Sequence, residues 1–542
     1  MRDPTEKQKK VKVGSNWAVT LFRAGLFVLV VGCLTWGLSG SFGLRSAAWK
    51  EGQVAPYTVY APFGYAYSDQ GTQANVERGE LIVSKGERLT AAHVIRLSAL
   101  DRTQGASRTR PHWFGAALIS LLFTGVGSIY LKRYEPVVWE TPQRIVLTLS
   151  LSALVCAIAE MFISSPVDNA WIPVAAVALP LSMLLGPRLG IILGLLVTGL
   201  IGLLAQADLP LVIGFGAGCF VAATVAQGIR RRIHFFRAGL LVGAAQGLMI
   251  LGGYLLMQWP AQAALGYSLA GVGSGILSAI ITFCILPICE SLFGLMSDVT
   301  LVEMSDLNHP LLKELSVKAP GTYHHSLIVA NLAEGACEAV GANALLARVG
   351  CYFHDIGKML HPEYFVENQP PDVSRHDHLS PSMSSLVILN HVKDGIGLAR
   401  GHRINQAIID FIPGHHGTGL IYYFYRRALE EVEDAELLKE ERFRYPGPKP
   451  STRETAIALL ADSVEAAARA LPQKTPARVG EVVRRIINNK FIDGQLDDCE
   501  LTLRDLHRIA EAFLRVLAGI YHSRVEYPKA PGEESEIGFA AG

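Results

Sequence analysis

An adjacent histidine and aspartate close an apolar run in the C-terminal half of the sequence. His354 and Asp355 directly follow Gly350-Cys351-Tyr352-Phe353, and Lys358 comes three residues after the aspartate. A lone His-Asp pair carries little information, but 13 of the 16 histidines in the chain lie after residue 300. Neutral imidazole and carboxylate are the ligands expected for iron, manganese or zinc in a hydrolytic site. The stretch therefore indicates the centre of a metal-dependent hydrolase.

Two metal ions need roughly six to eight protein ligands held on rigid elements. A carboxylate has two oxygens, so Asp355 is the natural bridge between two ions, and Lys358 could offset charge on a phosphate. Ions about 3.5–4 Å apart can share a hydroxide and stabilise in-line attack on a phosphodiester. We predict His354, Asp355 and Lys358 as catalytic residues and expect no organic cofactor. The candidate metal ligands are His325, His354, Asp355, His391, His415, His416 and Asp462.

Helices must position these side chains. From about residue 291 onward apolar residues recur at a spacing of three to four, which is typical of amphipathic helices, and no run of alternating strands is present. The C-terminal half is therefore predicted to be an all-helical soluble domain. The segments with helical spacing are 326–340, 343–353, 383–391, 405–412, 454–470, 478–489 and 503–520.

The preceding part of the chain has the composition of a membrane domain. Half of the 542 residues are hydrophobic, and charged residues are sparse between 111 and 290. Several apolar segments approach the ~20 residues that cross a bilayer as a helix. The formal net charge of +1 does not indicate binding to DNA or RNA. The predicted spans are 17–38, 112–131, 145–163, 171–186, 189–206, 209–227, 238–258 and 266–289.

Basic residues orient these spans. With the basic N-terminus inside, the inner loops carry Lys132, Arg133, Arg144, Arg188 and the basic run 230–237, whereas the short outer loops carry no Lys or Arg. This distribution follows the positive-inside rule. Eight crossings return the C-terminal half to the cytoplasm. The eight scattered cysteines include no C-x-x-C pair and none in the predicted external segment, which suits a reducing compartment.

The predicted architecture is all-α: a polytopic helical membrane domain, then a cytoplasmic all-helical hydrolase domain, with a small α+β external module. That module, between the first two spans, reads equally well as a structured linker or a sensor. The predicted boundaries are 1–38 for the N-terminus and first span, 39–110 for the external module, 111–290 for about seven membrane helices, 291–320 for a linker, 321–525 for the hydrolase domain and 526–542 for a disordered tail.

Several stretches in the C-terminal half resemble one family in the same order. The resemblance covers residues 290–525 densely and the membrane region by architecture. It is to the HD-domain metal-dependent phosphohydrolases, and in detail to the membrane-anchored seven-transmembrane HD phosphodiesterases of the PgpH type. The stretches that carry it include His354-Asp355-Ile356-Gly357-Lys358, His391-Val392-Lys393-Asp394-Gly395, His415-His416-Gly417-Thr418, Arg444-Tyr445-Pro446-Gly447-Pro448 and Ala461-Asp462-Ser463-Val464-Glu465.

The resemblance implies a membrane-anchored phosphodiesterase of the bacterial inner (plasma) membrane, with its catalytic domain in the cytoplasm. It implies hydrolysis of cyclic di-AMP to linear pApA, with iron or manganese as the two divalent ions, and it places the family's metal ligands on the same seven residues. Family members commonly carry a much larger external domain, whereas about 70 residues lie between the first two spans here. The external signal and the oligomeric state, including a homo-oligomer, stay open.

Two alternatives remain. The first is an HD hydrolase that acts on another cyclic dinucleotide or on a nucleotide phosphate. The cyclic di-GMP branch carries Gly-Tyr-Pro after its paired histidines, whereas His415-His416 precede Gly417-Thr418 here, which argues against that branch. The second is a membrane receptor that binds a ligand without turnover. Loss of metal ligands would favour the receptor, and none is lost.

Overall fold

The structure is a computed structural model that divides into two compact units, Met1–Val299 and Thr300–Gly542. Most of the predicted first span and the predicted disordered tail lie outside the described residues. The structure describes Arg23, 25–27, 30–33 and 49–521, except for 56–58, 62–63, 70–71, 78–79, 85, 106–110, 164, 166, 206, 371–373 and 432–437.

The described part of the module predicted at residues 39–110 contains two small antiparallel sheets and one helix. β1 pairs with β4, and β2 pairs with β3 in a register that opposes Tyr65 to Val76. The hydroxyl of Tyr65 donates to the carbonyl of Arg96, which ties the second sheet to the helix. The module therefore has the predicted α+β character. Its elements are β1 (Val59–Tyr60), β2 (Tyr65–Asp69), β3 (Thr72–Val76), β4 (Leu81–Val83) and α2 (Ala91–Gly105).

Six helices of the described chain are long and apolar enough to cross a membrane, namely α3, α5, α7, α8, α9 and α10. They make this a multi-pass membrane protein, as the apolar pattern predicted. The elements of this region are α3 (Pro111–Tyr134), α4 (Pro136–Glu140), α5 (Pro142–Ile163), η1 (Asn169–Trp171), α6 (Ala175–Leu185), α7 (Pro187–Ala205), α8 (Leu209–Val225), η2 (Ala226–Gly228), α9 (Arg232–Leu256) and α10 (Ala261–Phe293).

The predicted span 171–186 differs from the observed structure. A short 3-10 turn leads into α6, which has 11 residues, and a helix of that length rises only about 17 Å. Residues 174–182 are all buried among neighbouring helices. Uniform apolarity fits a helix inside the bundle as well as a helix in lipid, so the sequence pattern could not separate the two.

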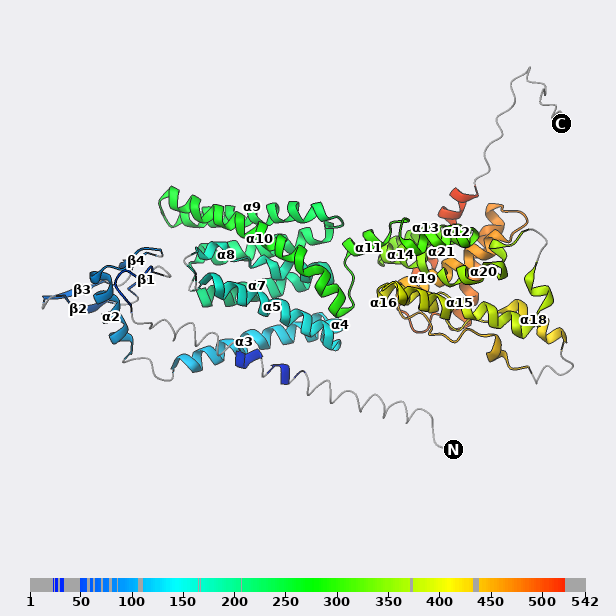
Figure 1. Cartoon of the computed structure of the whole chain (residues 1–542), viewed down its shortest axis with the longest axis horizontal. Helices are drawn as coiled ribbons and strands as arrows, with labels where there is room; N and C mark the ends of the chain where they lie inside the picture. The colour runs from blue at the N-terminus through cyan, green and yellow to red at the C-terminus, as the bar shows by residue number, and fades with distance from the viewer. Residues whose placement is uncertain are drawn as a thin grey trace, which may run out of the picture. The chain divides into compact units, whose positions relative to one another are not determined.

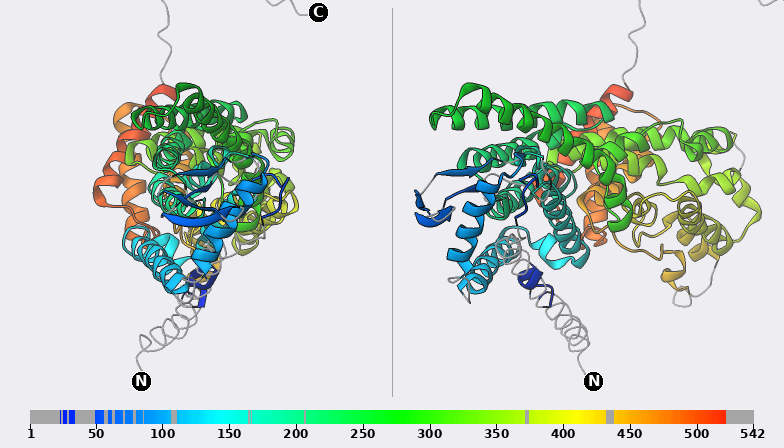
Figure 2. Two further views of the ribbon diagram at one scale, coloured as in Figure 1. Left: turned by 90° about the vertical axis from the view of Figure 1, so that its left-hand side faces the viewer. Right: turned by 60° about the vertical axis from the view of Figure 1, so that its left-hand side comes forward.

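Glycines bring α9 and α10 into close contact. A Cβ at Gly275 would overlap the backbone of Gly243, and a Cβ at Gly243 would overlap the carbonyl of Val272. Small residues at such crossings let membrane helices approach until their backbones touch. Figures 1 and 2 show the two helices, in the green part of the chain, lying side by side.

Helices make up almost all of the second unit, and only one isolated β-bridge, Leu420 to Arg444, occurs in its described part. This confirms the all-α prediction. The elements are α11 (Asp298–Met304), α12 (Pro310–Lys318), α13 (Pro320–Val340), α14 (Ala344–Phe353), η3 (Ile356–Leu360), η4 (Pro362–Tyr364), η5 (Val366–Asn368), η6 (Arg375–His378), α15 (Pro381–Gly401), α16 (Gln406–Ile409), α17 (Phe411–Gly414), α18 (Tyr422–Glu431), η8 (Glu440–Phe443), α19 (Arg453–Arg469), α20 (Pro476–Ile492) and α21 (Leu503–Ile520).

The core of this unit is α13, which packs against α14, α19 and α21. The side chain of Asn343 accepts from the amide of Leu346 and starts α14, while a capping box at Thr452 starts α19. These caps set where each helix begins, and therefore which side chains its ends present.

The segment 291–320, predicted as a linker, is not a separate connection in the structure, because part of it is a helix of the second unit. The division between the units falls after Val299, and α12 buries Leu311, Leu312 and Leu315. The ring of His309 meets the ring of Phe353, at the end of α14, edge-on at 5.2 Å. This helix therefore belongs to the second unit, because its apolar side chains pack there.

Candidate metal centre

His354 and Asp355 lie where α14 ends. The last residue of α14 is Phe353, and after it His354 keeps a helical backbone while Asp355 opens the 3-10 turn η3. Both side chains are almost fully buried, with 1% and 0% exposed. The helix end turns both side chains into the interior.

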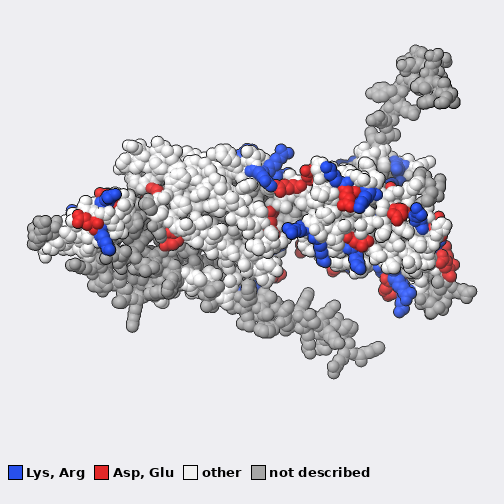
Figure 3. Space-filling model, viewed as in Figure 1, with Lys and Arg blue, Asp and Glu red and all other residues white. Residues whose placement is uncertain are grey.

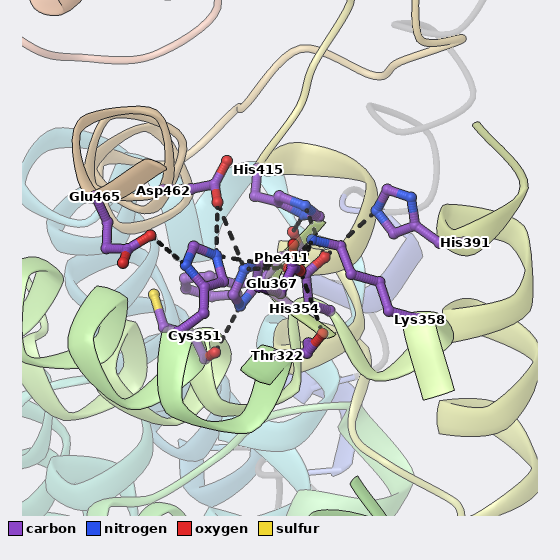
Figure 4. Close-up of polar contacts among 12 residues, drawn as sticks. Thr322, Cys351, His354, Lys358, Glu367, His391, Phe411, His415, Asp462 and Glu465 are labelled. Atoms are coloured by element: carbon purple, nitrogen blue, oxygen red, sulfur yellow. Dashed lines mark hydrogen bonds and ion pairs between the residues drawn. The ribbon is translucent and has the colours of Figure 1, made fainter. Parts of the chain in front are cut away.

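Four other segments deliver the remaining candidate ligands to the same place. His325 comes from α13, His391 from α15 and Asp462 from α19, while the pair His415-His416 directly follows α17. Figure 4 shows His354, His391, His415 and Asp462 around Lys358, with their polar atoms facing a common region.

The candidate ligands form two groups that share Asp355. One group is Asp355, His391, His415 and His416, and the other is His325, His354, Asp355 and Asp462. Within each group the ligand atoms all lie within 4.8 Å of one another. All seven residues that the sequence singled out are thus brought together. Their role as ligands stays a prediction, and the grouping is what a bridging carboxylate between two ions requires.

The oxygens of Asp355 are divided between the two groups. Its Oδ2 lies 3.1 Å from Nε2 of His354 and 3.6 Å from Nε2 of His325. Its Oδ1 lies 3.4 Å from Nε2 of His391 and 3.5 Å from Nε2 of His415. Each oxygen therefore faces a different set of imidazoles, as a carboxylate bridging two ions would.

Backbone carbonyls orient three of the imidazoles. Nδ1 of His354 lies 2.7 Å from the carbonyl of Cys351, and Nδ1 of His415 lies 3.0 Å from that of Phe411. Nδ1 of His391 is held in the same way by the carbonyl of Ile388, at 2.5 Å. Since Nδ1 must donate to a carbonyl, the lone pair of Nε2 is left for the centre.

Those inward nitrogens are buried without hydrogen-bond partners. Within the described part of the chain, Nε2 of His354, His391 and His415 makes no hydrogen bond, and neither does Oδ1 of Asp355. A buried polar atom left unpaired costs about 1–3 kcal/mol, so several at one point need an explanation. Metal ions would satisfy all of them at once, so the residues fit such ions.

A carboxylate holds His325 instead of a carbonyl. Nδ1 of His325 lies 2.5 Å from Oε2 of Glu465, while its Nε2 lies 3.0 Å from Oδ1 of Asp462. Asp462 and Glu465 are three residues apart on α19, so both face the same imidazole. A carboxylate behind an imidazole fixes its orientation and raises its basicity as a ligand.

The centre is built to receive positive charge. Burial alone raises the pKa of Asp355, but the charges of His354 and Lys358 outweigh it and hold that pKa well below its usual range. Burial lowers the pKa of His354, yet the carboxylates of Asp355 and Asp462 overcome this and raise it to about 10. Burial lowers the pKa of His391 to about 4. The pKa values of the two imidazoles thus move in opposite directions, because His354 faces two carboxylates while burial dominates at His391.

Lys358 completes a buried ion network. Its Nζ lies 2.8 Å from Oδ2 of Asp355 and 2.9 Å from Oε1 of Glu367, with 12% of its side chain exposed. Thr322 also donates to Oε1 of Glu367, at 3.2 Å, and thereby links α13 to η5. Burial lowers the pKa of Lys358, but the two carboxylates outweigh burial and raise it above its ordinary value. Lys358 is therefore a fixed cation beside Asp355.

Acid is expected to destabilise this network. Burial raises the pKa of Glu367, but the Lys358 ammonium outweighs it and lowers the pKa below its ordinary value. A carboxyl with a depressed folded pKa contributes stability above its unfolded pKa of about 4.3, and loses it as the pH falls through the folded pKa. We expect urea midpoints between pH 7 and pH 3 to fall less in Glu367→Gln than in the wild-type chain. Exposed Glu363→Gln serves as the control, and equal slopes would contradict this role.

His416 is placed by an aromatic contact. Its ring stacks on Tyr445, with centroids 4.0 Å apart and planes inclined by 19°. Burial and the neighbouring imidazoles of His415 and His391 lower the pKa of His416 well below its usual range. A neutral imidazole is the form that binds a metal ion.

A glycine lets η3 approach α15 at the centre. A Cβ at Gly357 would overlap the carbonyl oxygen of His391 and crowd the amide nitrogen of Gly395. Any larger residue must therefore push α15 away and move His391 with it. The glycine in the sequence run after Asp355 thus serves packing between two segments that are distant in the chain.

We expect Gly357→Ala to destabilise the second unit by about 1–3 kcal/mol, the usual cost of overpacking, and to weaken metal binding. Thermal unfolding and metal content of the purified full chain would measure both effects. Gly397→Ala, on the same helix α15 with nothing within 4 Å of its Cβ, is the matched control and should not destabilise. Equal unfolding temperatures for the two variants would rule out the close approach.

Three neighbours of the ligand groups were not predicted from the sequence: Glu367, Tyr445 and Glu465. Glu465 had a local signal, since it lies at i+3 from Asp462 in a helical segment. Glu367 and Tyr445 had none, because they reach the centre only through the packing of η5 and of the segment after η8. Other histidines stay outside the two groups; His324 is exposed, and Nε2 of buried His376 faces the carbonyl of Tyr364 at 2.8 Å.

Comparison with known families matches both halves of the chain. Residues 111–297 match a family described as "7TM receptor with intracellular HD hydrolase", and residues 322–467 match the HD domain. An HD domain implies divalent metal binding. Every member of the buried His/Asp cluster lies within the matched range.

Two curated relatives carry the name cyclic-di-AMP phosphodiesterase PgpH. The protein from Bacillus subtilis is 34% identical over 478 residues, 85% of this chain and 66% of its own length. The protein from Listeria monocytogenes is 44% identical over 304 residues, 55% of this chain and 41% of its own. The chain therefore spans less than two thirds of the length of either relative.

A solved structure is also similar. It is titled as the HD domain of the L. monocytogenes phosphodiesterase PgpH in complex with cyclic di-AMP. It is 48% identical in sequence, covers 40% of this chain and 100% of its own, and has a TM-score of 0.38.

Proposed function

We propose that the chain is a member of the family of multi-span membrane proteins that carry an HD hydrolase domain, and that it hydrolyses cyclic di-AMP to linear pApA. The observation that carries the proposal is the pair of ligand groups that share Asp355. The name of the two curated relatives supports the choice of substrate. Glycine and threonine after the paired histidines, at Gly417-Thr418, favour cyclic di-AMP over cyclic di-GMP.

We assign the metal ligands to the two groups. His325, His354 and Asp462 would hold one ion, and His391, His415 and His416 the other, with Asp355 between them. When bound, such a pair of ions lowers the pKa of water and neutralises phosphate charge. Imidazole and carboxylate without thiolate suit iron or manganese, which we propose as the native metals.

The chain's own residues supply position and charge. The carbonyls of Cys351, Ile388 and Phe411 fix the tautomers, so the imidazoles are oriented before any ion binds. Lys358 places a permanent cation next to Asp355, where it stabilises the extra negative charge of a phosphodiester under attack. His354 and Asp355 are proposed as catalytic residues together with Lys358.

We place the hydrolase unit in the cytoplasm and the spans in the bacterial inner membrane. The basic residues of the predicted inner loops support this orientation. They lie at helix ends, as Lys132 and Arg133 do at the last turn of α3 and Arg231 does just before α9. A cytoplasmic site would meet a cytoplasmic second messenger.

The test is hydrolysis by the purified full chain in detergent, loaded with manganese or iron. Cyclic di-AMP and cyclic di-GMP are incubated in parallel and the products are separated by chromatography. Conversion of cyclic di-AMP to pApA that stops with a chelator is the expected result. Faster hydrolysis of another nucleotide would show that cyclic di-AMP is not the substrate. Tight binding of cyclic di-AMP without cleavage would favour a receptor.

A further inference from the structure

Two apolar grooves flank one end of α9 in the membrane unit. The first lies between α9 and α10 and has a volume of about 190 Å³; its wall includes Phe236, Gly239, Ile280 and Phe283. Phe236 and Ile280 are 60% and 54% exposed, so apolar side chains face outward here. This end of α9 is therefore open to lipid.

The second groove lies on the other side of α9, between it and the end of α8 with η2. Its volume is about 260 Å³, and Val225, Ile229, Ala238 and Leu241 line it. Its lining positions on α9 follow a separate stripe from those of the first groove, since residues two apart on a helix point about 200° apart. One helix thus presents two slots to the bilayer.

Arginines stand at the mouths of both grooves. Arg232 lines the first and Arg237 lines the second, and Arg231 precedes the helix. Arg231 and Arg237 are exposed. Figure 3 shows basic groups gathered at one end of the membrane-spanning helices, whose sides are almost free of charge. Arg230 instead pairs with Asp298, whose Oδ2 lies 3.7 Å from its Nε.

The spacing of charge and apolar surface matches a phospholipid. From Arg231 to Leu241 the helix rises about 15 Å, which is half the thickness of the hydrocarbon core. Each groove therefore runs from headgroup level into one leaflet. His234 shapes the mouth of the second groove, since its Nδ1 accepts from the amide of Arg230 at 3.2 Å.

We propose that this end of α9 is a binding site for an anionic phospholipid, with its phosphate among the arginines and its acyl chains in the two grooves. Basic pockets between membrane helices on the cytoplasmic side recognise such headgroups. The occupant follows from charge complementarity, because the phosphate of a zwitterionic lipid is offset by its own headgroup cation, whereas an anionic lipid brings an uncompensated negative charge to the arginines. The proposal is independent of the hydrolase chemistry.

The test is native mass spectrometry of the full chain in detergent, titrated with phosphatidylglycerol or phosphatidylcholine. Wild-type chain is expected to bind phosphatidylglycerol at least about tenfold more tightly. Each arginine near the surface contributes about 1 kcal/mol to the binding of an anionic lipid. The double variant Arg231→Gln/Arg237→Gln should therefore bind phosphatidylglycerol about 30-fold more weakly, and its affinity for phosphatidylcholine should not change.

Two further variants separate charge from fit. Arg133→Gln removes an exposed arginine from α3 that lines neither groove, and its affinities should stay within about twofold of wild type. Leu241→Trp narrows the second groove without changing its charge and should lower the affinity for phosphatidylglycerol. Equal binding of both lipids by the wild-type chain, or unchanged phosphatidylglycerol affinity in the double variant, would overturn the proposal. Cyclic di-AMP turnover, measured on the same samples, reports the hydrolase separately.

Discussion

Replacement of Asp355 by asparagine is expected to abolish hydrolysis of cyclic di-AMP, with a loss of at least about 10³-fold in kcat. Asp355 is the only residue common to both ligand groups in the described part of the chain, so its change affects both proposed ions. Asparagine keeps the volume of the side chain but removes its charge and one of its two oxygens. Turnover and metal content of the purified full chain would be measured together.

The control for this variant is Asp498→Asn, which removes an exposed carboxylate in the same unit and should keep full activity and metal. Loss of both metal ions from Asp355→Asn would support the proposal that Asp355 bridges them. Retention of two ions with normal turnover would contradict it. Loss of only one ion would show that Asp355 serves a single ion.

Removal of the Lys358 ammonium should cost the fold about 3–5 kcal/mol, because Lys358→Met leaves Glu367 buried without its cation. Only 9% of the Glu367 side chain is exposed, so water cannot replace the lost partner. Lys358→Met/Glu367→Gln removes both charges of this pair and should recover most of that stability. Urea unfolding of the three variants, including Glu367→Gln alone, completes the cycle.

Activity should not recover with stability. If Lys358 acts on phosphate charge, the double variant stays at least about 10²-fold slower than wild type while it retains its metals. Wild-type turnover in a stable double variant would show that Lys358 is a positioning residue for Glu367 alone. Lys318→Met is the matched control for stability, because its pair with Glu314 is exposed on the surface of α12 and such pairs contribute less than about 1 kcal/mol.

Residue type and local spacing carried much of the prediction. The apolar runs indicated a multi-span membrane domain, and the three-to-four spacing after residue 291 indicated a helical unit; both are confirmed. The histidines and carboxylates of the site could be selected because few other functions bring so many of these residue types into one half of a chain. Periodicity and ligand chemistry are local properties, so one sequence contains them.

The position of α6 illustrates the limit of such patterns. Its 11 residues are as apolar as a span, and only its packing among neighbouring helices shows that protein rather than lipid surrounds it. Helix α12 shows the same limit in the second unit. Its short amphipathic sequence was predicted to be part of a linker, yet Leu311, Leu312 and Leu315 are buried in the second unit.

Residue type and order along the chain indicated which side chains could hold ions, whereas packing between distant helices sets how these side chains combine. His325 and Glu465 are 140 residues apart, and they meet only because α13 packs against α19. The division of the ligands around Asp355, the buried pair of Lys358 with Glu367 and the stack of His416 on Tyr445 arise in the same way. Such pairings depend on burial and on contacts between distant segments, which no local spacing in the chain contains.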